Sequence, residues 1–217
     1  MQFKGGDSTL SDTTITNAAV NTGGGEGGII QGFAWNGNLI GQFTYNGTDT
    51  EGGVSGLGYV QHHDFLVMPN GNILMIVVQD YTTTQAEAAG FNPNLFDSNT
   101  TSTGLIEIDG LVEVTPNWSS DSCTVVWQWS FWNRLVQDYD PTGETFYTNS
   151  EGQTVNVSDY ASNIDNPQLL DANCGTHTIQ FYKHANGIDY NASLNQIVIS
   201  ARNQCEIYII DASTTSD

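Results

Sequence analysis

The strongest constraint on the fold of this chain is a series of short β-forming runs separated by turn residues. Residues 27–45 and 62–79 each read as strand, turn and strand, and an Asn-Gly pair in each turn supplies the positive φ angle that a tight hairpin needs. Residues 110–132 and 184–201 have the same form, and residues 206–211 make one more strand after them. The chain is therefore predicted to be all-β and to consist of antiparallel hairpins.

Serial hairpins at this spacing favour a β-propeller, in which two hairpins make one four-stranded blade. Residues 27–217 then hold about two and a half blades, including a full blade over about residues 60–132. The Gly/Thr-rich segment 1–26 carries no predicted hairpin, residues 84–96 suggest a helix, and about 137–183 form a long loop. Because propellers close with about four to eight blades, we expect either a longer protein or self-association through open sheet edges.

The charge of the chain is strongly negative. It has 24 acidic residues against four basic ones, which gives a net charge of −20. Such a surface repels nucleic acids and anionic membranes, so neither is expected as a partner. The apolar runs are only as long as strands, and the sequence therefore predicts no insertion into a membrane.

Other features concern the compartment of the protein and its cofactors. Three widely spaced cysteines without a C-x-x-C pair argue against a zinc site, and they would allow one disulfide in a secreted protein. The N-terminus shows no signal peptide. Five N-x-[ST] sequons would be used in an exported glycoprotein, and they begin at Asn46, Asn99, Asn117, Asn156 and Asn191. We predict neither a bound metal nor a cofactor.

The scarce cations point to one candidate site. On a strand, His184 and Asn186 are two positions apart and share a face, and Arg202 ends the following strand. A guanidinium fork beside an imidazole and an amide suits a tetrahedral oxyanion such as sulfate or phosphate. In the alternative interpretation, Arg202 pairs with one of the many carboxylates and His184 only ends the strand.

The adjacent residues His62 and His63 form a second candidate. Neighbours on a strand point to opposite faces, so we expect at most one of them to reach a given pocket. Three interpretations remain open: an active-site imidazole, a hydrogen-bonded structural pair, or a metal site that includes Asp64. The third would make the protein a metal-dependent hydrolase.

Five long stretches of the sequence carry further information. They read GGIIQGFAWNGNLIGQF, HHDFLVMPNGNIL, VVWQWSFWNRLVQDYDPT, NPQLLDAN and HANGIDYNASLNQIVISARNQCEIYIIDAST. In this order, from about residue 27 to the C-terminus, they resemble the arylsulfate sulfotransferase family. The resemblance implies an extracellular or periplasmic β-propeller enzyme that needs no nucleotide donor. Its substrates would be a phenolic sulfate ester, which gives up a sulfuryl group, and a phenol, which accepts it.

The resemblance also implies roles for particular residues. The H-x-N motif of the family matches His184 and Asn186, its arginine matches Arg202, and the histidine before the P-N-G-N hairpin matches His63 or His62. These groups would hold and polarise the sulfuryl oxygens. A further histidine from a later blade would attack sulfur in a ping-pong reaction, and we expect it beyond residue 217.

The chain departs from the family at two places. Residues 132–135 read WNRL where the family has WDHL, and residues 209–213 read IIDAS where it has IIDHS. Two functions therefore remain open. The protein is an arylsulfotransferase-like enzyme, or it is a non-catalytic extracellular propeller that serves as a structural or ligand-binding module.

Overall fold

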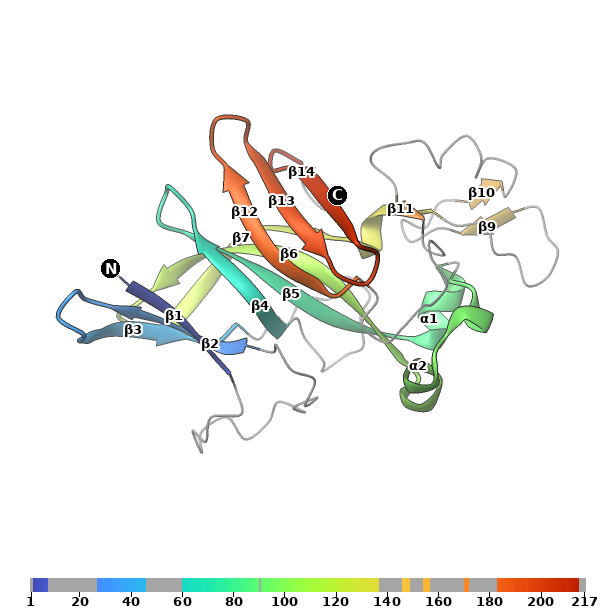
Figure 1. Cartoon of the computed structure of the whole chain (residues 1–217), viewed down its shortest axis with the longest axis horizontal. Helices are drawn as coiled ribbons and strands as arrows, with labels where there is room; N and C mark the ends of the chain where they lie inside the picture. The colour runs from blue at the N-terminus through green and yellow to red at the C-terminus, as the bar shows by residue number, and fades with distance from the viewer. Residues whose placement is uncertain are drawn as a thin grey trace.

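Figure 1 shows the computed structural model of the chain, which consists of antiparallel sheets with a few short helices. The structure describes residues 2–7, 27–45, 60–89, 91–136, 146–148, 154–156, 170–171 and 183–214. Three sheets of three or four strands dominate, and within these ranges they form no closed ring. The predicted fold class, an all-β protein of incomplete propeller blades, is confirmed.

A four-stranded antiparallel sheet is the centre of the fold. Its strands are β4 (Val60–Val67), β5 (Ile73–Thr82), β6 (Leu105–Asn117) and β7 (Ser122–Ser130), in that order. The turn between β4 and β5 is closed by the Met68 N–H, which donates to the Asn72 carbonyl at 2.8 Å, and Gly71 has a φ of 86°. Consecutive strands are neighbours, so the blade predicted over residues 60–132 is confirmed.

A three-stranded sheet lies on each side of this blade. The first contains β1 (Gln2–Asp7), β2 (Gly27–Phe33) and β3 (Leu39–Phe43), and the other contains β12 (Ala185–Asn191), β13 (Gln196–Ala201) and β14 (Glu206–Asp211). The hairpins predicted over residues 27–45 and 184–201 are confirmed. The sequence predicted no strand within residues 1–26, whereas β1 pairs with β2.

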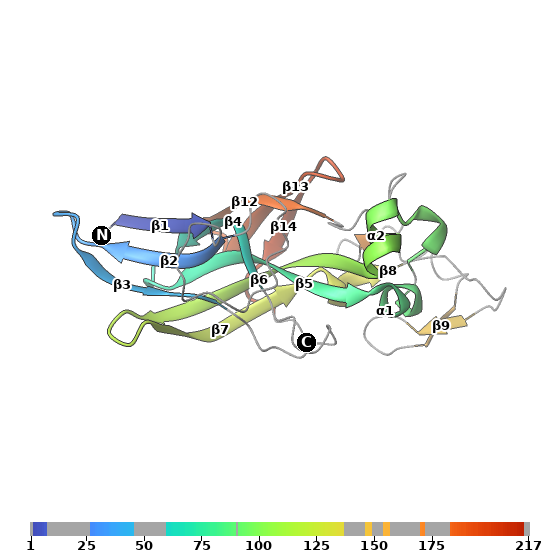
Figure 2. The same ribbon diagram turned by 90° about the horizontal axis from the view of Figure 1, so that it is seen from below.

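The remaining elements are short. They are α1 (Thr83–Ala88), η1 (Pro93–Leu95), α2 (Ser98–Thr103), η2 (Trp132–Arg134), the parallel pair β8 (Leu135–Val136) and β11 (Leu170–Asp171), and the antiparallel pair β9 (Phe146–Thr148) and β10 (Thr154–Asn156). The predicted helix at 84–96 is found as α1 and η1. Both views place α1 and α2 at the end of the central blade away from the β2–β3 hairpin (Figures 1 and 2). Apart from β9, β10, β11 and Lys183, the predicted loop at 137–183 lies outside the described residues, as does His177.

Strand β5 shows how the sheets stack. Ile73, Met75 and Val77 pack into a core shared with the first sheet, and Leu74 and Ile76 pack into a second core shared with the β12–β14 sheet. All five side chains are fully buried. The central blade is therefore covered on both faces, which is the face-to-face packing of consecutive propeller blades. In this packing, β12 of the third sheet also contacts β4 of the central blade. The candidate residues lie at this contact.

Among the helices in the described part of the chain, none is long and apolar enough to cross a membrane.

Candidate functional site

An irregularity in β4 sets the direction of the two adjacent histidines. The pairing of β4 with β5 shifts between Gln61 and Phe65, and His63 inside this bulge has a φ of 51°. Left-handed backbone is unusual for a residue with a side chain. Since a bulge re-aims the side chains within it, simple alternation along the strand does not apply at His62 and His63.

The start of β12 has the same two features. His184 directly precedes the strand with a φ of 51°, and the pairing of β12 with β13 shifts between Ala185 and Gly187. Asn186 lies inside this bulge. The two irregular segments face each other where β12 contacts β4.

The imidazoles of His63 and His184 meet at this contact. Their Nε2 atoms are 2.8 Å apart, and their ring centroids are 4.9 Å apart. The amide nitrogen of Asn186 lies 3.3 Å from Nδ1 of His63. The prediction that His184 and Asn186 face one place is correct in outcome. The cause is a left-handed residue followed by a bulge, rather than the regular alternation that the sequence analysis assumed.

With the Asn186 amide nitrogen facing His63, one set of tautomers satisfies both contacts. An amide nitrogen only donates, so Nδ1 of His63 accepts and the ring carries its proton on Nε2. His63 therefore donates through Nε2 to Nε2 of His184, which carries its own proton on Nδ1. Both ring nitrogens of His63 are engaged, and in this set of tautomers both rings are neutral.

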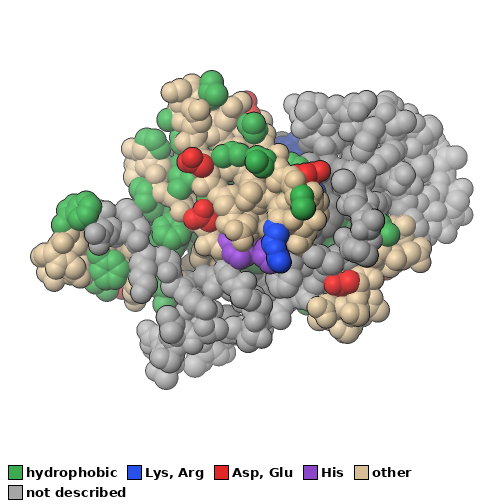
Figure 3. Space-filling view, viewed as in Figure 1, with side chains coloured by type: hydrophobic (Ala, Val, Ile, Leu, Met, Phe, Trp, Pro, Cys, Tyr) green, Lys and Arg blue, Asp and Glu red, His purple; other side chains and the backbone are tan. Residues whose placement is uncertain are grey.

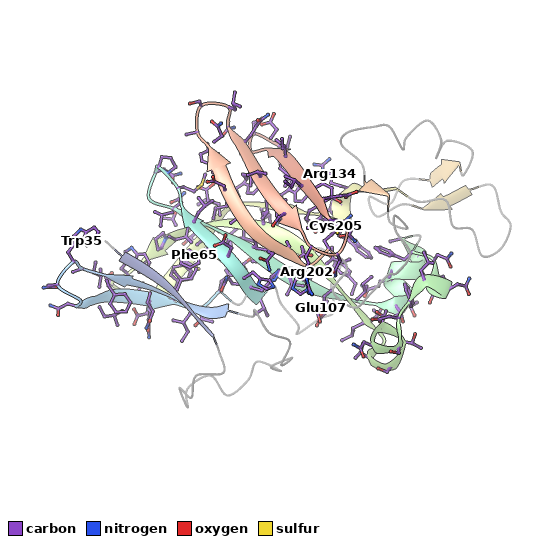
Figure 4. The ribbon with its side chains drawn as sticks, in the orientation of Figure 1. Trp35, Phe65, Glu107, Arg134, Arg202 and Cys205 are labelled. Atoms are coloured by element: carbon purple, nitrogen blue, oxygen red, sulfur yellow. The ribbon has the colours of Figure 1, made fainter. Side chains whose placement is uncertain are left out.

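Arg202 lies beside the two imidazoles. It begins the turn after β13, and its backbone N–H donates to the His184 carbonyl at 3.2 Å. Figure 4 shows Arg202 near the start of β4, and Figure 3 shows a basic side chain directly next to the histidines on the same face. The guanidinium is exposed, and it makes no ion pair with a carboxylate among the described residues. The alternative interpretation, a structural ion pair at Arg202, therefore has no support in the described part of the chain.

The electrostatic surroundings favour neutral imidazoles. Burial, followed by the neighbouring His62 and His184, lowers the pKa of His63 below 6.5. Burial, followed by the Arg202 charge, lowers the pKa of His184 in the same direction. Asp109 acts against both shifts. An anion placed beside Arg202 would raise the pKa of both imidazoles, since a negative charge stabilises a protonated imidazole.

The structure separates the roles of His62 and His63. His62 is 7% exposed, and its Nε2 lies 2.9 Å from Oδ1 of the buried Asp109, although the angle is not that of a hydrogen bond. His63 is only partly buried and faces His184 and Asn186. Of the two histidines, His63 is therefore the one that contacts His184 and Asn186, a choice that the sequence left open.

The described residues contain no group of three His, Cys, Asp or Glu side chains placed to hold a metal ion. Asp64 turns instead to the backbone, where its carboxylate accepts from the N–H groups of Phe65 at 2.9 Å and Ile188 at 3.2 Å. Cys123 and Cys205 are free thiols, and Cys174 lies outside the described residues.

Sequence analysis missed Asp109 as a neighbour of the site. It stands in the run LIEIDGLVEV of β6, where an acidic residue occupies the middle of an otherwise apolar strand. A buried carboxylate at such a position needs partners, and this was the available signal.

The comparison with protein families agrees with these observations. A family model described as Arylsulfotransferase (ASST) matches residues 28–216, which include every candidate residue. No curated protein and no solved structure matches the chain significantly. The matched range covers most of the 217 residues, and the chain belongs to the arylsulfotransferase family.

Proposed function

We propose that the protein transfers a sulfuryl group from a phenolic sulfate ester to an acceptor phenol, and that His63, His184, Asn186 and Arg202 hold this group. The observation that supports the proposal best is the meeting of two neutral imidazoles, an amide and an exposed guanidinium at one contact between blades. A sulfuryl group is tetrahedral and anionic, and it has three oxygens to bind. Arg202 offers two parallel N–H donors, and the Asn186 amide offers the N–H that does not face His63.

Binding of the anionic ester also needs a local positive charge in this strongly negative chain. With a net charge of −20, the protein as a whole repels an anion. Arg202 lies beside the two imidazoles and supplies the positive charge that attracts an anion. Its freedom from a carboxylate partner within the described residues supports this use.

In the first half-reaction, an imidazole nitrogen forms a bond to sulfur while the ester S–O bond breaks. The electron pair of that bond leaves with the phenolate. The bound sulfate ester favours protonation of the imidazole pair, and the imidazolium so formed gives its proton to the phenolate. Both ring nitrogens of His63 already have partners, as does Nε2 of His184. We therefore place the attacking histidine elsewhere, in a later blade beyond residue 217.

In the second half-reaction, the acceptor phenol gives its proton to the imidazole that lost one in the first half-reaction, and its oxygen attacks the same sulfur. The N–S bond breaks, and its electron pair returns to the imidazole. Arg202 stabilises the charge on the sulfuryl oxygens in both transition states. The reaction is ping-pong, with a sulfohistidine between its halves and no cofactor.

Family membership and the acidic surface support an extracellular or periplasmic location, where small phenols and their sulfate esters would be the partners. The second function left open by the sequence is a non-catalytic module. It is favoured by the missing histidines at residues 132–135 and 209–213.

The test uses the full-length natural protein with 4-nitrophenyl sulfate as donor and phenol as acceptor. We expect 4-nitrophenolate to be released faster when phenol is present, and phenyl sulfate to accumulate in equal amount. A labelled sulfuryl group should be found on a histidine when phenol is omitted. Binding of the donor without release of 4-nitrophenolate would contradict the enzyme and support the module.

A further inference from the structure

Asp109 is a buried carboxylate that the proposed reaction does not yet use. It lies in β6, in the middle of the central blade, and is 2% exposed. Its neighbours in sequence are the fully buried Ile108 and Gly110, where an added Cβ would lie 2.9 Å from the Trp129 carbonyl oxygen. A charge in such a place is costly unless other groups compensate it.

The groups that compensate Asp109 come from two different blades. Its Oδ1 accepts a hydrogen bond from the Ala185 N–H at 3.1 Å, and the same atom lies 2.9 Å from Nε2 of His62. His62 belongs to β4 of the central blade, and Ala185 begins β12 of the next. One oxygen atom therefore joins the two strands whose contact forms the site.

Each of these partners is next in sequence to a residue of the imidazole pair. His62 precedes His63, and Ala185 follows His184. Both members of the pair have left-handed backbone, with a φ of 51°. A conformation of this kind persists only where surrounding contacts hold it, and Asp109 supplies one such contact beside each of the two residues.

We propose that Asp109 is a positioning residue of the sulfuryl-transfer site: its carboxylate holds His62 and the Ala185 amide and thereby sets His63 and His184 opposite each other. This role rests on the function proposed above. Asp109 acts on the imidazole pair through His62, through the Ala185 amide and through its charge.

The charge of Asp109 has a predictable effect on the pair. It raises the pKa of His63 and of His184, against burial, His62 and Arg202, which lower both. His184 also lowers the pKa of His63. Without the negative charge, both imidazoles should protonate only at still lower pH. A step that needs a protonated imidazole would then lose its rate at a lower pH than in the wild type.

The experiment compares Asp109→Asn with Glu107→Gln in the full-length natural protein. Glu107 is the matched control because it is a buried carboxylate on the same strand that does not act on either imidazole. NMR titration of the histidine side chains should show lower pKa values for His63 and His184 in Asp109→Asn and unchanged values in Glu107→Gln.

In the transfer assay, Asp109→Asn should lower kcat by about 100-fold, with KM changed much less, because misplacement of catalytic groups slows the reaction more than it weakens binding. The alkaline limb of its pH profile should move to lower pH.

A second pair of variants tests the same role through the partner of Asp109. His62→Gln puts an N–H donor beside the carboxylate, whereas in His62→Leu the Ala185 N–H is the remaining one of its two partners. We expect His62→Gln to have at least about tenfold higher kcat than His62→Leu. If Asp109→Asn does not fold, the comparison of His62→Gln with His62→Leu still tests the role of Asp109.

Two results would overturn the role of Asp109. They are histidine pKa values and a pH profile in Asp109→Asn equal to those of the wild type, or equal kcat values for His62→Gln and His62→Leu. If the wild-type protein transfers no sulfuryl group, the proposed function fails, and the NMR titration still decides whether Asp109 controls the imidazole pair.

Discussion

The imidazole Nε2 atoms of His63 and His184 lie 2.8 Å apart, although 121 positions separate the two residues in the chain. Each has a φ of 51°. Left-handed backbone costs a residue with a side chain about 1–2 kcal/mol, and residues of this kind cluster at functional sites. Two such residues in direct contact, one from each of two neighbouring blades, indicate that the contact between the blades specifies this pair.

The strain at His63 predicts different effects for two substitutions. His63→Asn should fold nearly as stably as the wild type, because asparagine tolerates left-handed backbone. His63→Val should be less stable than His63→Asn by about 1–2 kcal/mol, because a β-branched side chain clashes with that backbone. Urea unfolding measures the difference. Equal free energies of unfolding for the two variants would mean that the left-handed conformation is absent in solution.

The pKa values of His63 and His184 predict a pH dependence of stability. Both lie below 6.5, chiefly because the rings are partly buried. Near that pH the unfolded chain binds protons that the folded protein does not, so the free energy of unfolding should fall as the pH is lowered from 6.5 towards the folded-state values. Urea unfolding between about pH 7.5 and pH 5.5 covers this range, above the titration of ordinary carboxylates. A double variant with asparagine at both positions should show a smaller slope, and an unchanged slope would refute the assignment.

Arg202 should matter as a fork of two donors and as a charge. Arg202→Lys keeps the charge and should raise KM for 4-nitrophenyl sulfate by about tenfold, and Arg202→Ala should lower kcat/KM by at least about 100-fold. Arg202→Ala should also raise the pKa of His184, because the guanidinium lowers it. Arg134→Ala is the control, since Figure 4 shows Arg134 well away from Arg202. An effect of Arg134→Ala as large as that of Arg202→Ala would argue against a local anion site.

The packing of the first sheet on the central blade can be tested at Gly41. A Cβ added there would lie 2.2 Å from the Trp118 carbonyl oxygen, so the backbone would have to move. Gly41→Ala should therefore lower the free energy of unfolding by about 2 kcal/mol or more. In the same sheet, a Cβ at Gly32 would lie 3.4 Å from the Trp118 ring, and Gly32→Ala should cost less than about 1 kcal/mol. Equal losses in thermal unfolding would show that this contact does not form.

Much of the fold could be predicted from the sequence, because turn residues and β-forming runs are local signals. The strand predicted at residues 206–211 has the same bounds as β14. Strand β6 was predicted to begin at residue 110, whereas it begins at Leu105. Glu107 and Asp109 interrupt the apolar pattern there, yet both are buried. Charged residues that find partners inside a fold cannot be distinguished by pattern from residues that face water.

The site was predictable only as a set of residue types. The sequence placed His184, Asn186 and Arg202 in one unit, and the structure brings them together with His63. It gave no sign that His63 and His184 adopt left-handed backbone, since glycine and asparagine are the usual residues there. Contacts between blades, such as that of Asp109 with Ala185, depend on how distant segments pack. They have no local signal.

The most direct test of the account is the effect of an anion on the two imidazoles. Histidine side-chain NMR of the full-length protein, with and without saturating inorganic sulfate, would report the pKa values of His63 and His184. We predict that sulfate raises both pKa values and that Arg202→Ala reduces the affinity for sulfate. If both pKa values stay the same at saturating sulfate, these residues do not form one anion site, and the central claim is contradicted.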